Sequence, residues 1–220
     1  MTIMNRWRLY KPTSGFTLME LLIVIAIIAF LGCLFLPAHF KAKDRSKRIA
    51  CTSNLKIIGV SFRQWALDHT NANPMAISTN FGGTLEHAGT GEVWRHFQVM
   101  SNELSTPSVL VCFSDRTRTR VRNFGPGTSN KNISYFVGLD ANDTMPQMFL
   151  AGDRNLIGGT MLPNRILLLT TNDAVRWGKD LHKNQGNVAL ADGSVQGFSS
   201  SRLQEALANS GVETNRLAMP

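Results

Sequence analysis

The 220-residue chain lacks the short motifs that mark most enzyme active sites. It contains no G-x-S-x-G, no H-E-x-x-H and no G-x-x-x-x-G-K-[ST] sequence, so it shows no sign of a serine hydrolase, a zinc protease or a nucleotide-binding loop. Its glycines are scattered among turn sequences and do not precede a helix as a phosphate cradle would. We therefore predict that the protein is not an enzyme.

Cysteine is also scarce, because the chain has only three. No pair forms a C-x-x-C motif or lies at the usual spacing from histidine, so the sequence does not favour a structural metal module. Cys33 lies within an apolar run, where it acts as a small packing residue. Cys51 and Cys112 could form a disulfide in an oxidising compartment, and the sequence leaves open whether they meet.

Acidic residues are few, with 15 Asp and Glu against 23 Lys and Arg and a formal charge of +8. The basic excess is concentrated in residues 41–48, with five basic residues, and in residues 116–122, with four. Neither cluster is interleaved with aromatic residues, and no nucleic-acid-binding motif follows. We predict solvated or interface charge, available to lipid headgroups or acidic neighbours, and no nucleic-acid partner.

The sequence does contain a long apolar run. Residues 21–36 include no charged residue, no Asn and no Gln. As an α-helix, the segment 16–40 would be about 37 Å long, which exceeds a hydrocarbon core of about 30 Å. We predict a single membrane span there, although Glu20 near its start would cost about 3 kcal/mol at the bilayer centre.

Residues 1–15 carry three basic residues and no acidic one, which is compatible with three kinds of export signal. A secretory signal cleaved after the apolar run would lack an A-x-A site and would contain Glu20 in its apolar region. A lipoprotein signal would end at Cys33, but Phe30 and Leu31 are a poor match to the residues that such a signal requires. The third kind is cleaved before the run, after Gly15.

A family resemblance supports the third kind. The run Gly15-Phe16-Thr17-Leu18-Met19-Glu20-Leu21-Leu22 resembles the signal of type IV pilins and type II secretion pseudopilins. The resemblance implies that a prepilin peptidase cuts after Gly15 and N-methylates Phe16. It also implies that Glu20 guides filament assembly and that Pro37 is the helix-kinking proline of pilins.

Basic residues on both sides of the apolar run leave its orientation undecided. The peptidase of this family acts on the cytoplasmic face, so the resemblance implies a single-pass protein of the bacterial inner membrane. Its N-terminus would be cytoplasmic and its C-terminal domain periplasmic.

The new amine at Phe16 would lie one helical turn from Glu20, and Glu20 of one subunit could pair with the amine of its neighbour. In a low-dielectric core such a pair sets register more than it adds stability.

The helical pattern continues beyond the apolar run, and no helix breaker interrupts it before Asn73-Pro74. The sequence therefore predicts one helix over about 16–69, with its apolar face formed by Ile49, Leu55, Ile58, Phe62, Trp65 and Ala66. Downstream it predicts a short helix over 94–104 and strands over 108–113, 133–139, 147–151, 165–170, 187–191 and 194–198. Asp192-Gly193 is the turn of the last hairpin.

We expect an α+β, pilin-like fold in which a long N-terminal helix packs on a small, mainly antiparallel β-sheet domain. The predicted parts are a leader (1–15), a membrane-spanning and assembly half of the helix (16–40), its second half (41–70) and a globular domain (71–220).

Three downstream segments resemble one group of bacterial prepilin-like proteins. They begin at Cys51, at Met100 and at His182, and the last has the pattern H-x9-D-G that ends in Asp192-Gly193. This resemblance narrows the family to pseudopilin-like proteins and implies no role for these residues. Position favours a hydrogen-bonded structural role for His182 at the hairpin base over a role as a metal ligand, and it explains Asp192 as a turn residue without an ion.

Calcium is the one cofactor that the resemblance raises, because major pseudopilins bind it in a C-terminal loop. Asn172, Asp173 and Asp180 are the candidate oxygen ligands here. Residues 140–144 fail the EF-hand spacing, and no other loop has the required periodicity. The sequence therefore leaves two alternatives, no cofactor or calcium at these three residues.

Together these features predict a structural pseudopilin of a type II secretion-like system, assembled into a periplasmic pseudopilus that assists protein export. The implied partners are the prepilin peptidase, other pseudopilins in a homo- and hetero-oligomeric filament, the inner-membrane secretion platform and membrane lipid. The alternative is a minor type IV pilin or a membrane-anchored surface module for binding or adhesion.

Overall fold

The computed structural model describes residues 15–220, except for the side chains of residues 34–41. It divides into two compact units at the boundary between Lys43 and Asp44. A single helix, α1 (Leu18–Asp68), contributes to both units, close to the bounds predicted from the sequence. Pro37 lies in this helix, but its side chain and the predicted kink lie outside the described residues.

Against the predicted span over residues 16–40, no helix in the described part of the chain is long and apolar enough to cross a membrane.

A seven-stranded antiparallel sheet forms the centre of the second unit, with strand order β4-β5-β9-β1-β2-β7-β8. Its strands are β1 (Tyr135–Gly138), β2 (Phe149–Asp153), β4 (Thr160–Met161), β5 (Ile166–Thr170), β7 (Gln185–Leu190), β8 (Val195–Ser199) and β9 (Thr214–Ala218). A separate two-stranded sheet pairs β3 (Leu156–Ile157) with β6 (Arg176–Trp177). The α+β class and the packing of the long helix on an antiparallel sheet are thus confirmed.

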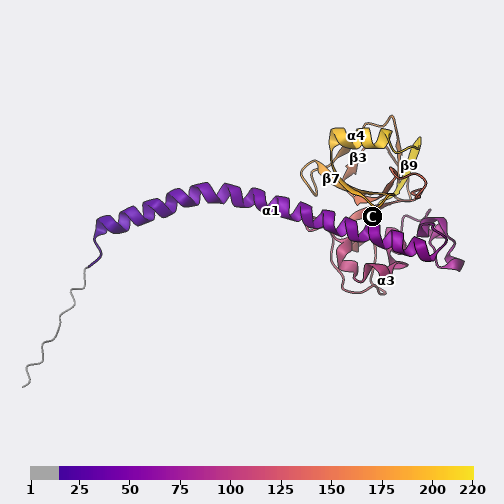
Figure 1. Cartoon of the computed structure of the whole chain (residues 1–220), viewed down its shortest axis with the longest axis horizontal. Helices are drawn as coiled ribbons and strands as arrows, with labels where there is room; N and C mark the ends of the chain where they lie inside the picture. The colour runs from indigo at the N-terminus through magenta and orange to yellow at the C-terminus, as the bar shows by residue number, and fades with distance from the viewer. Residues whose placement is uncertain (1–14) are drawn as a thin grey trace, which may run out of the picture. The chain divides into compact units, whose positions relative to one another are not determined.

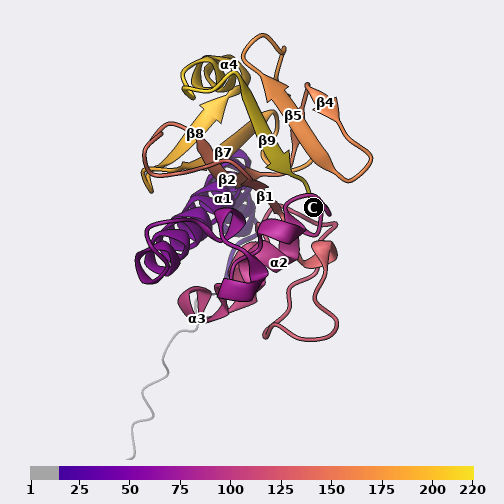
Figure 2. The same cartoon turned by 90° about the vertical axis from the view of Figure 1, so that its right-hand side faces the viewer.

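Helices cover both faces of the large sheet. In the second unit, α1 lies on one face together with α2 (Val93–Gln98) and α3 (Ser101–Leu104), and α4 (Ser200–Ala208) lies on the other (Figures 1 and 2). Five 3-10 helices occur in the connections: η1 (Pro74–Ala76), η2 (Thr79–Phe81), η3 (Leu85–His87), η4 (Pro107–Leu110) and η5 (Asn130–Asn132).

The two faces bury separate apolar clusters, as the alternation of side chains along a strand requires. On β1, Tyr135 and Val137 join the cluster under α1, whereas Phe136 joins the cluster under α4. On α1 the buried apolar positions are spaced three or four residues apart: Cys51, Leu55, Ile58, Phe62 and Trp65. Cys51 occupies the place on this stripe that the sequence assigned to Ile49, and Ile49 is exposed.

The predicted strand over 108–113 is wrong. Residues 107–110 form the 3-10 helix η4, because Pro107 occupies its first turn and the hydroxyl of Thr106 accepts a hydrogen bond from the amide of Ser108. The helix predicted over 94–104 is divided into α2 and α3. The last hairpin is present as predicted, with Gly193 at the turn in a left-handed conformation, φ 84°.

Candidate functional site

The residues around the predicted cleavage position form the start of α1. Thr17 and Glu20 make a capping box: Glu20 Oε2 accepts hydrogen bonds from the backbone amide and the hydroxyl of Thr17, both at 2.8 Å. In return, Thr17 Oγ1 accepts a hydrogen bond from the amide of Glu20 at 3.2 Å. These bonds satisfy donors that a helix start leaves free, and they explain why the helix begins at Leu18. Gly15 and Phe16 precede the helix and belong to no helix or strand.

The first turns of α1 present apolar side chains in all directions. The large hydrophobic residues of this stretch that are more than one-third exposed are Leu18, Met19, Leu21, Leu22, Ile23, Val24, Ile25, Ile27, Ile28, Phe30 and Leu31. A helix that is apolar on every side requires an apolar environment or apolar partners. This surface therefore indicates association through α1.

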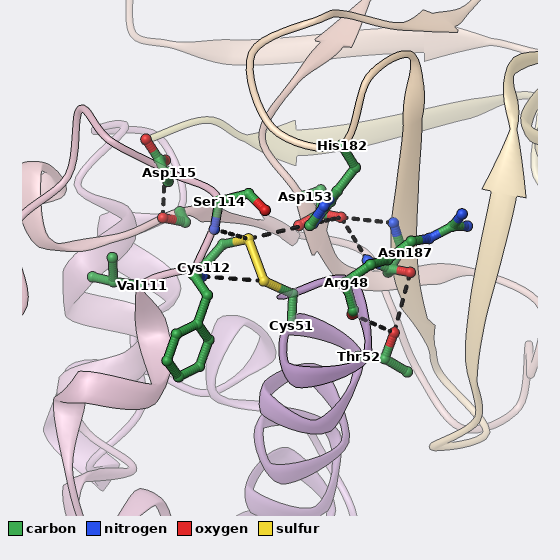
Figure 3. The surroundings of a disulfide bond; sticks show 12 residues. Arg48, Cys51, Thr52, Val111, Cys112, Ser114, Asp115, Asp153, His182 and Asn187 are labelled. Carbon is green, nitrogen blue, oxygen red and sulfur yellow. Dashed lines mark hydrogen bonds and ion pairs between the residues drawn. A yellow bond between two sulfur atoms is a disulfide. The ribbon is translucent and has the colours of Figure 1, made fainter. Parts of the chain in front are cut away.

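A buried junction joins α1 to the sheet in the second unit. A disulfide links Cys51 on α1 with Cys112, in the loop after η4, with their Cα atoms 5.3 Å apart (Figure 3). The two cysteines are separated by 61 positions in sequence and both are buried. The structure thus brings together the two residues whose meeting the sequence left open.

His182 of the H-x9-D-G pattern lies directly on this disulfide (Figure 3). Its Nε2 is 3.3 Å from Cys112 Sγ and 3.5 Å from Asp153 Oδ2, at the end of β2. Asp153 is fully buried, and its Oδ2 accepts hydrogen bonds from the amide and the side-chain Nδ2 of Asn187, at 2.7 and 2.9 Å. The imidazole thus lies between the disulfide and a buried carboxyl group.

Two further hydrogen bonds connect β7 of this junction to α1. Thr52 Oγ1 donates a hydrogen bond of 3.2 Å to Asn187 Oδ1, and Arg48 donates one to the side chain of Gln185 at the start of β7. Asn187 therefore contacts both α1 and Asp153. The other end of the pattern has a local role, since Asp192 Oδ1 accepts a hydrogen bond from the amide of Ser194 across the hairpin turn.

Burial shifts the pKa values of Asp153 and His182, the two titratable groups of the junction, in opposite directions. It raises the pKa of Asp153 from 3.8 to about 7, against the hydrogen bonds from Asn187. It lowers the pKa of His182 from 6.5 to about 4, and the positive charge of Arg48 adds to this effect. At neutral pH the imidazole is therefore neutral, and its contact with Asp153 is a polar contact rather than an ion pair.

These shifts predict two opposing pH dependences of stability. Between pH 3.8 and about 7, Asp153 keeps a proton in the folded state that it has lost in the unfolded chain. Its contribution to the stability of the folded state therefore falls as pH rises. Between about pH 4 and 6.5, His182 binds a proton in the unfolded chain that it does not bind in the folded state. The contribution of His182 to the stability of the folded state therefore rises with pH. The contributions of these two groups to stability should nearly cancel where the two windows overlap.

The Asp153→Asn variant lacks the contribution to stability that falls as pH rises. Its melting temperature, measured relative to wild type, should therefore increase from pH 4 to 7. His182→Gln should show the opposite trend. Melting curves in a constant-ionic-strength buffer series measure both differences, with the exposed turn variant Asp192→Asn as the control. Parallel profiles for all four proteins would contradict the assignment of these two groups.

A second buried carboxylate lies beside the junction. Asp115 receives a two-pronged contact from Arg154, with Nε–Oδ2 at 2.7 Å and Nη2–Oδ1 at 3.1 Å, and a hydrogen bond from Ser134 Oγ at 2.9 Å. Burial alone would raise the pKa of Asp115, but Arg154 and Thr117 outweigh it and lower the pKa to about 2. This pair ties the loop after Cys112 to the end of β2.

Part of the basic cluster over residues 116–122 stabilises the fold. Arg118 donates a hydrogen bond to the carbonyl of Pro220, and Arg120 donates one to the carbonyl of Val111. The guanidinium of Arg120 also lies 3.9 Å from the centre of the Phe113 ring. These contacts assign a structural role to two of the four arginines.

The calcium candidates are not collected into a carboxylate cluster. Asp173 closes the turn after β5, since its Oδ2 accepts a hydrogen bond of 2.6 Å from the amide of Thr170. Asn172 and Asp180 are exposed in the surrounding loops. Within the described residues, only Cys51, Cys112 and His182 form a group of three or more His, Cys, Asp or Glu side chains close enough to share a metal ion. Calcium binding at the three loop residues stays a prediction.

Sequence reasoning missed Asp153, Asn187 and Asp115, which complete the junction. Asn187 lies inside the H-x9-D-G segment, and this position could have identified it as a residue of the junction. Asp153 and Asp115 belong to no recognisable motif. Their importance depends on burial, which no local pattern showed.

Residues 10–32 match a family model described as the prokaryotic N-terminal methylation motif. No curated protein and no solved structure matches the chain. The matched residues include Gly15, Phe16 and the Thr17–Glu20 capping box, so the chain carries a prepilin signal of the type IV pilin and pseudopilin-like kind.

Proposed function

We propose that this protein is a structural pseudopilin of a type II secretion-like system, cleaved after Gly15 and assembled through α1 into a periplasmic filament that assists protein export. The observation that carries the proposal is the methylation motif over residues 10–32, which leads directly into a helix with apolar side chains on every side. The motif implies processing by a prepilin peptidase and assembly with other pilin-like subunits. It also suggests that the precursor is anchored in a membrane.

Glu20 supplies the electrostatic part of the assembly mechanism. In the isolated chain its carboxylate is bound by the amide and hydroxyl of Thr17, which holds it at the start of the helix. Cleavage after Gly15 creates an amine at Phe16, within one turn of that carboxylate. In the filament, Glu20 of one subunit pairs with the amine of its neighbour and fixes the axial register between the helices.

The buried junction supplies the mechanical part. A filament subunit transmits force between its N-terminal helix and its globular domain. Here the disulfide connects α1 to the loop after η4, and the Thr52–Asn187 contact connects α1 to the sheet. The subunit performs no chemistry of its own, and a separate cytoplasmic ATPase supplies the energy. Its partners are other pseudopilins, the inner-membrane secretion platform and membrane lipid, and its domain faces the periplasm.

N-terminal sequencing of the mature protein tests the cleavage step. Cells with a prepilin peptidase should yield a protein that begins with N-methylated Phe16, and cells without it should keep the full precursor. Gly15→Val should block cleavage without disturbing the fold, since a Cβ atom at Gly15 meets no other atom within 4 Å. Gly125→Ala is the matched control, because its Cβ is equally unobstructed. A mature protein that begins at Cys33 would contradict the proposal.

Deletion of the gene distinguishes secretion from surface display. The proposal expects exported proteins to accumulate in the periplasm while surface fibres remain. Loss of fibres or adhesion with export intact would instead identify a minor type IV pilin, which uses the same signal and the same kind of helix.

A further inference from the structure

Three buried side chains of the junction bring their metal-ligating atoms close together, and a fourth lies beside one of them. Cys51 Sγ, Cys112 Sγ and a ring nitrogen of His182 all lie within 4.8 Å of one another. The fourth is Asp153, whose Oδ2 is 3.5 Å from His182 Nε2. All four residues are buried, and they come from α1, the loop after η4, the loop before β7 and the end of β2.

Two backbone amides are directed at the sulfur atoms. The amide of Phe113 donates a hydrogen bond of 3.2 Å to Cys51 Sγ, and the amide of Ser114 donates one of 3.4 Å to Cys112 Sγ. An uncharged sulfur is a weak acceptor and gains little from such donors. Hydrogen bonds to sulfur matter most when the sulfur carries negative charge, as it does in metal thiolate centres.

The carboxyl group of Asp153 is held as a metal ligand would be. Two hydrogen bonds from Asn187 fix Oδ2, which is the outer-sphere support typical of ligating carboxylates. Among the described residues, Oδ1 of this fully buried group has no hydrogen-bond partner. An unsatisfied buried carboxylate oxygen is costly in an apolar interior unless a cation or a donor reaches it.

We propose that the junction is a zinc site when Cys51 and Cys112 are thiols: the two thiolates and His182 bind one Zn²⁺, and the neighbouring Asp153 moves in to complete a tetrahedral site. With metal–ligand bonds of about 2.0–2.3 Å, neighbouring ligand atoms of such a site lie about 3.3–3.8 Å apart. The 3.3 Å between His182 Nε2 and Cys112 Sγ and the 3.5 Å between His182 Nε2 and Asp153 Oδ2 meet this requirement. The two sulfur atoms must separate, and Asp153 must move closer to them, because it lies outside the group of Cys51, Cys112 and His182 ligand atoms that are within 4.8 Å of one another.

Zinc and the disulfide are therefore alternative links between the same segments. The chain is synthesised with thiols, so zinc binding needs no reductant. Two thiol protons pass to solvent, two metal–sulfur bonds form, and no electrons are exchanged. Two thiolates and a neutral imidazole favour Zn²⁺ over Ca²⁺, which takes oxygen ligands. This site does not depend on the proposed function, because it lies wholly in the second unit.

Cobalt substitution tests the site directly. The full-length Cys33→Ser protein in detergent retains only the two junction cysteines, and a phosphine reduces them under anaerobic conditions. One equivalent of Co²⁺ should then produce a sulfur-to-cobalt charge-transfer band and the intense visible bands of tetrahedral Co²⁺, and Zn²⁺ should abolish both. The same protein with its disulfide intact should produce neither. Absence of the charge-transfer band from the reduced protein would overturn the proposal.

Variants identify the other two ligands. His182→Ala and Asp153→Ala should each weaken binding by about 100-fold or more, since loss of an outer-sphere partner alone typically costs about 10- to 100-fold. His87→Ala, at a half-buried histidine outside the junction, is the matched control and should bind as the parent does. Circular dichroism of the disulfide-bonded forms checks that each variant folds. Parent-like affinity in His182→Ala would overturn the site.

A kinetic measurement needs no variant at the junction. Saturating Zn²⁺ should slow oxidation of the reduced Cys33→Ser protein by glutathione disulfide about tenfold or more, because metal-bound thiolates are withdrawn from exchange. An oxidation rate unchanged by Zn²⁺ would count against the proposal even if a variant failed to fold.

Discussion

Glu20→Ala should leave cleavage after Gly15 intact and abolish incorporation of the protein into filaments. Without the carboxylate, the amine of the neighbouring subunit would enter the helix bundle unpaired, and an uncompensated buried charge costs about 3–5 kcal/mol. Such a cost at every subunit is enough to stop polymerisation. Immunoblots of sheared filaments, normalised to the mature protein in the membrane fraction, measure the effect.

Glu20→Gln separates the charge from the capping role. Glutamine can replace glutamate in a capping box, so this variant keeps the hydrogen bonds that define the start of α1. We expect it to be cleaved normally and to fail in assembly as Glu20→Ala does. Filament levels equal to wild type would show that Glu20 acts only as a cap.

Loss of the disulfide should have the largest effect on stability. The two cysteines are separated by 61 positions, and in the chain-entropy treatment a crosslink across such a loop contributes about 4 kcal/mol. The double variant Cys51→Ser/Cys112→Ser should therefore lower the free energy of unfolding by about this amount. Urea titration of the full chain in detergent, followed by tryptophan fluorescence, measures the difference.

Cys33→Ser is the matched control, because Cys33 is exposed and takes no part in the second unit. It should unfold at the same urea concentration as the wild type. Equal midpoints for the double variant and for this control would show that the junction is held by its packing and hydrogen bonds rather than by the covalent link.

Local signals allowed the signal peptide and much of the fold to be predicted. The cleavage motif is contiguous, and the stripe on α1 from Leu55 to Trp65 repeats at helical spacing. The turn at Asp192-Gly193 is encoded by two residues. By contrast, β9 was missed because Asn215 and Arg216 interrupt its apolar pattern. Asn215 is buried against the side chain of Ser210, and Arg216 pairs with Asp140.

The junction could not be predicted, because its parts come from distant positions. Metal-site and redox motifs are found in a sequence by their spacing, and here the two cysteines, His182 and Asp153 have no shared spacing. They meet only because α1, β2 and β7 are adjacent in the folded domain. The H-x9-D-G pattern indicated a region but no partner for its histidine.

The position of β9 determines when this domain can fold. The last strand of the chain lies between β5 and β1, in the interior of the sheet, and it pairs with both. Until residues 214–218 are delivered, β5 and β1 each have an open edge and the sheet is in two pieces. Folding of the sheet is therefore completed only after residues 214–218 have joined it, so a chain truncated before them cannot form the seven-stranded sheet.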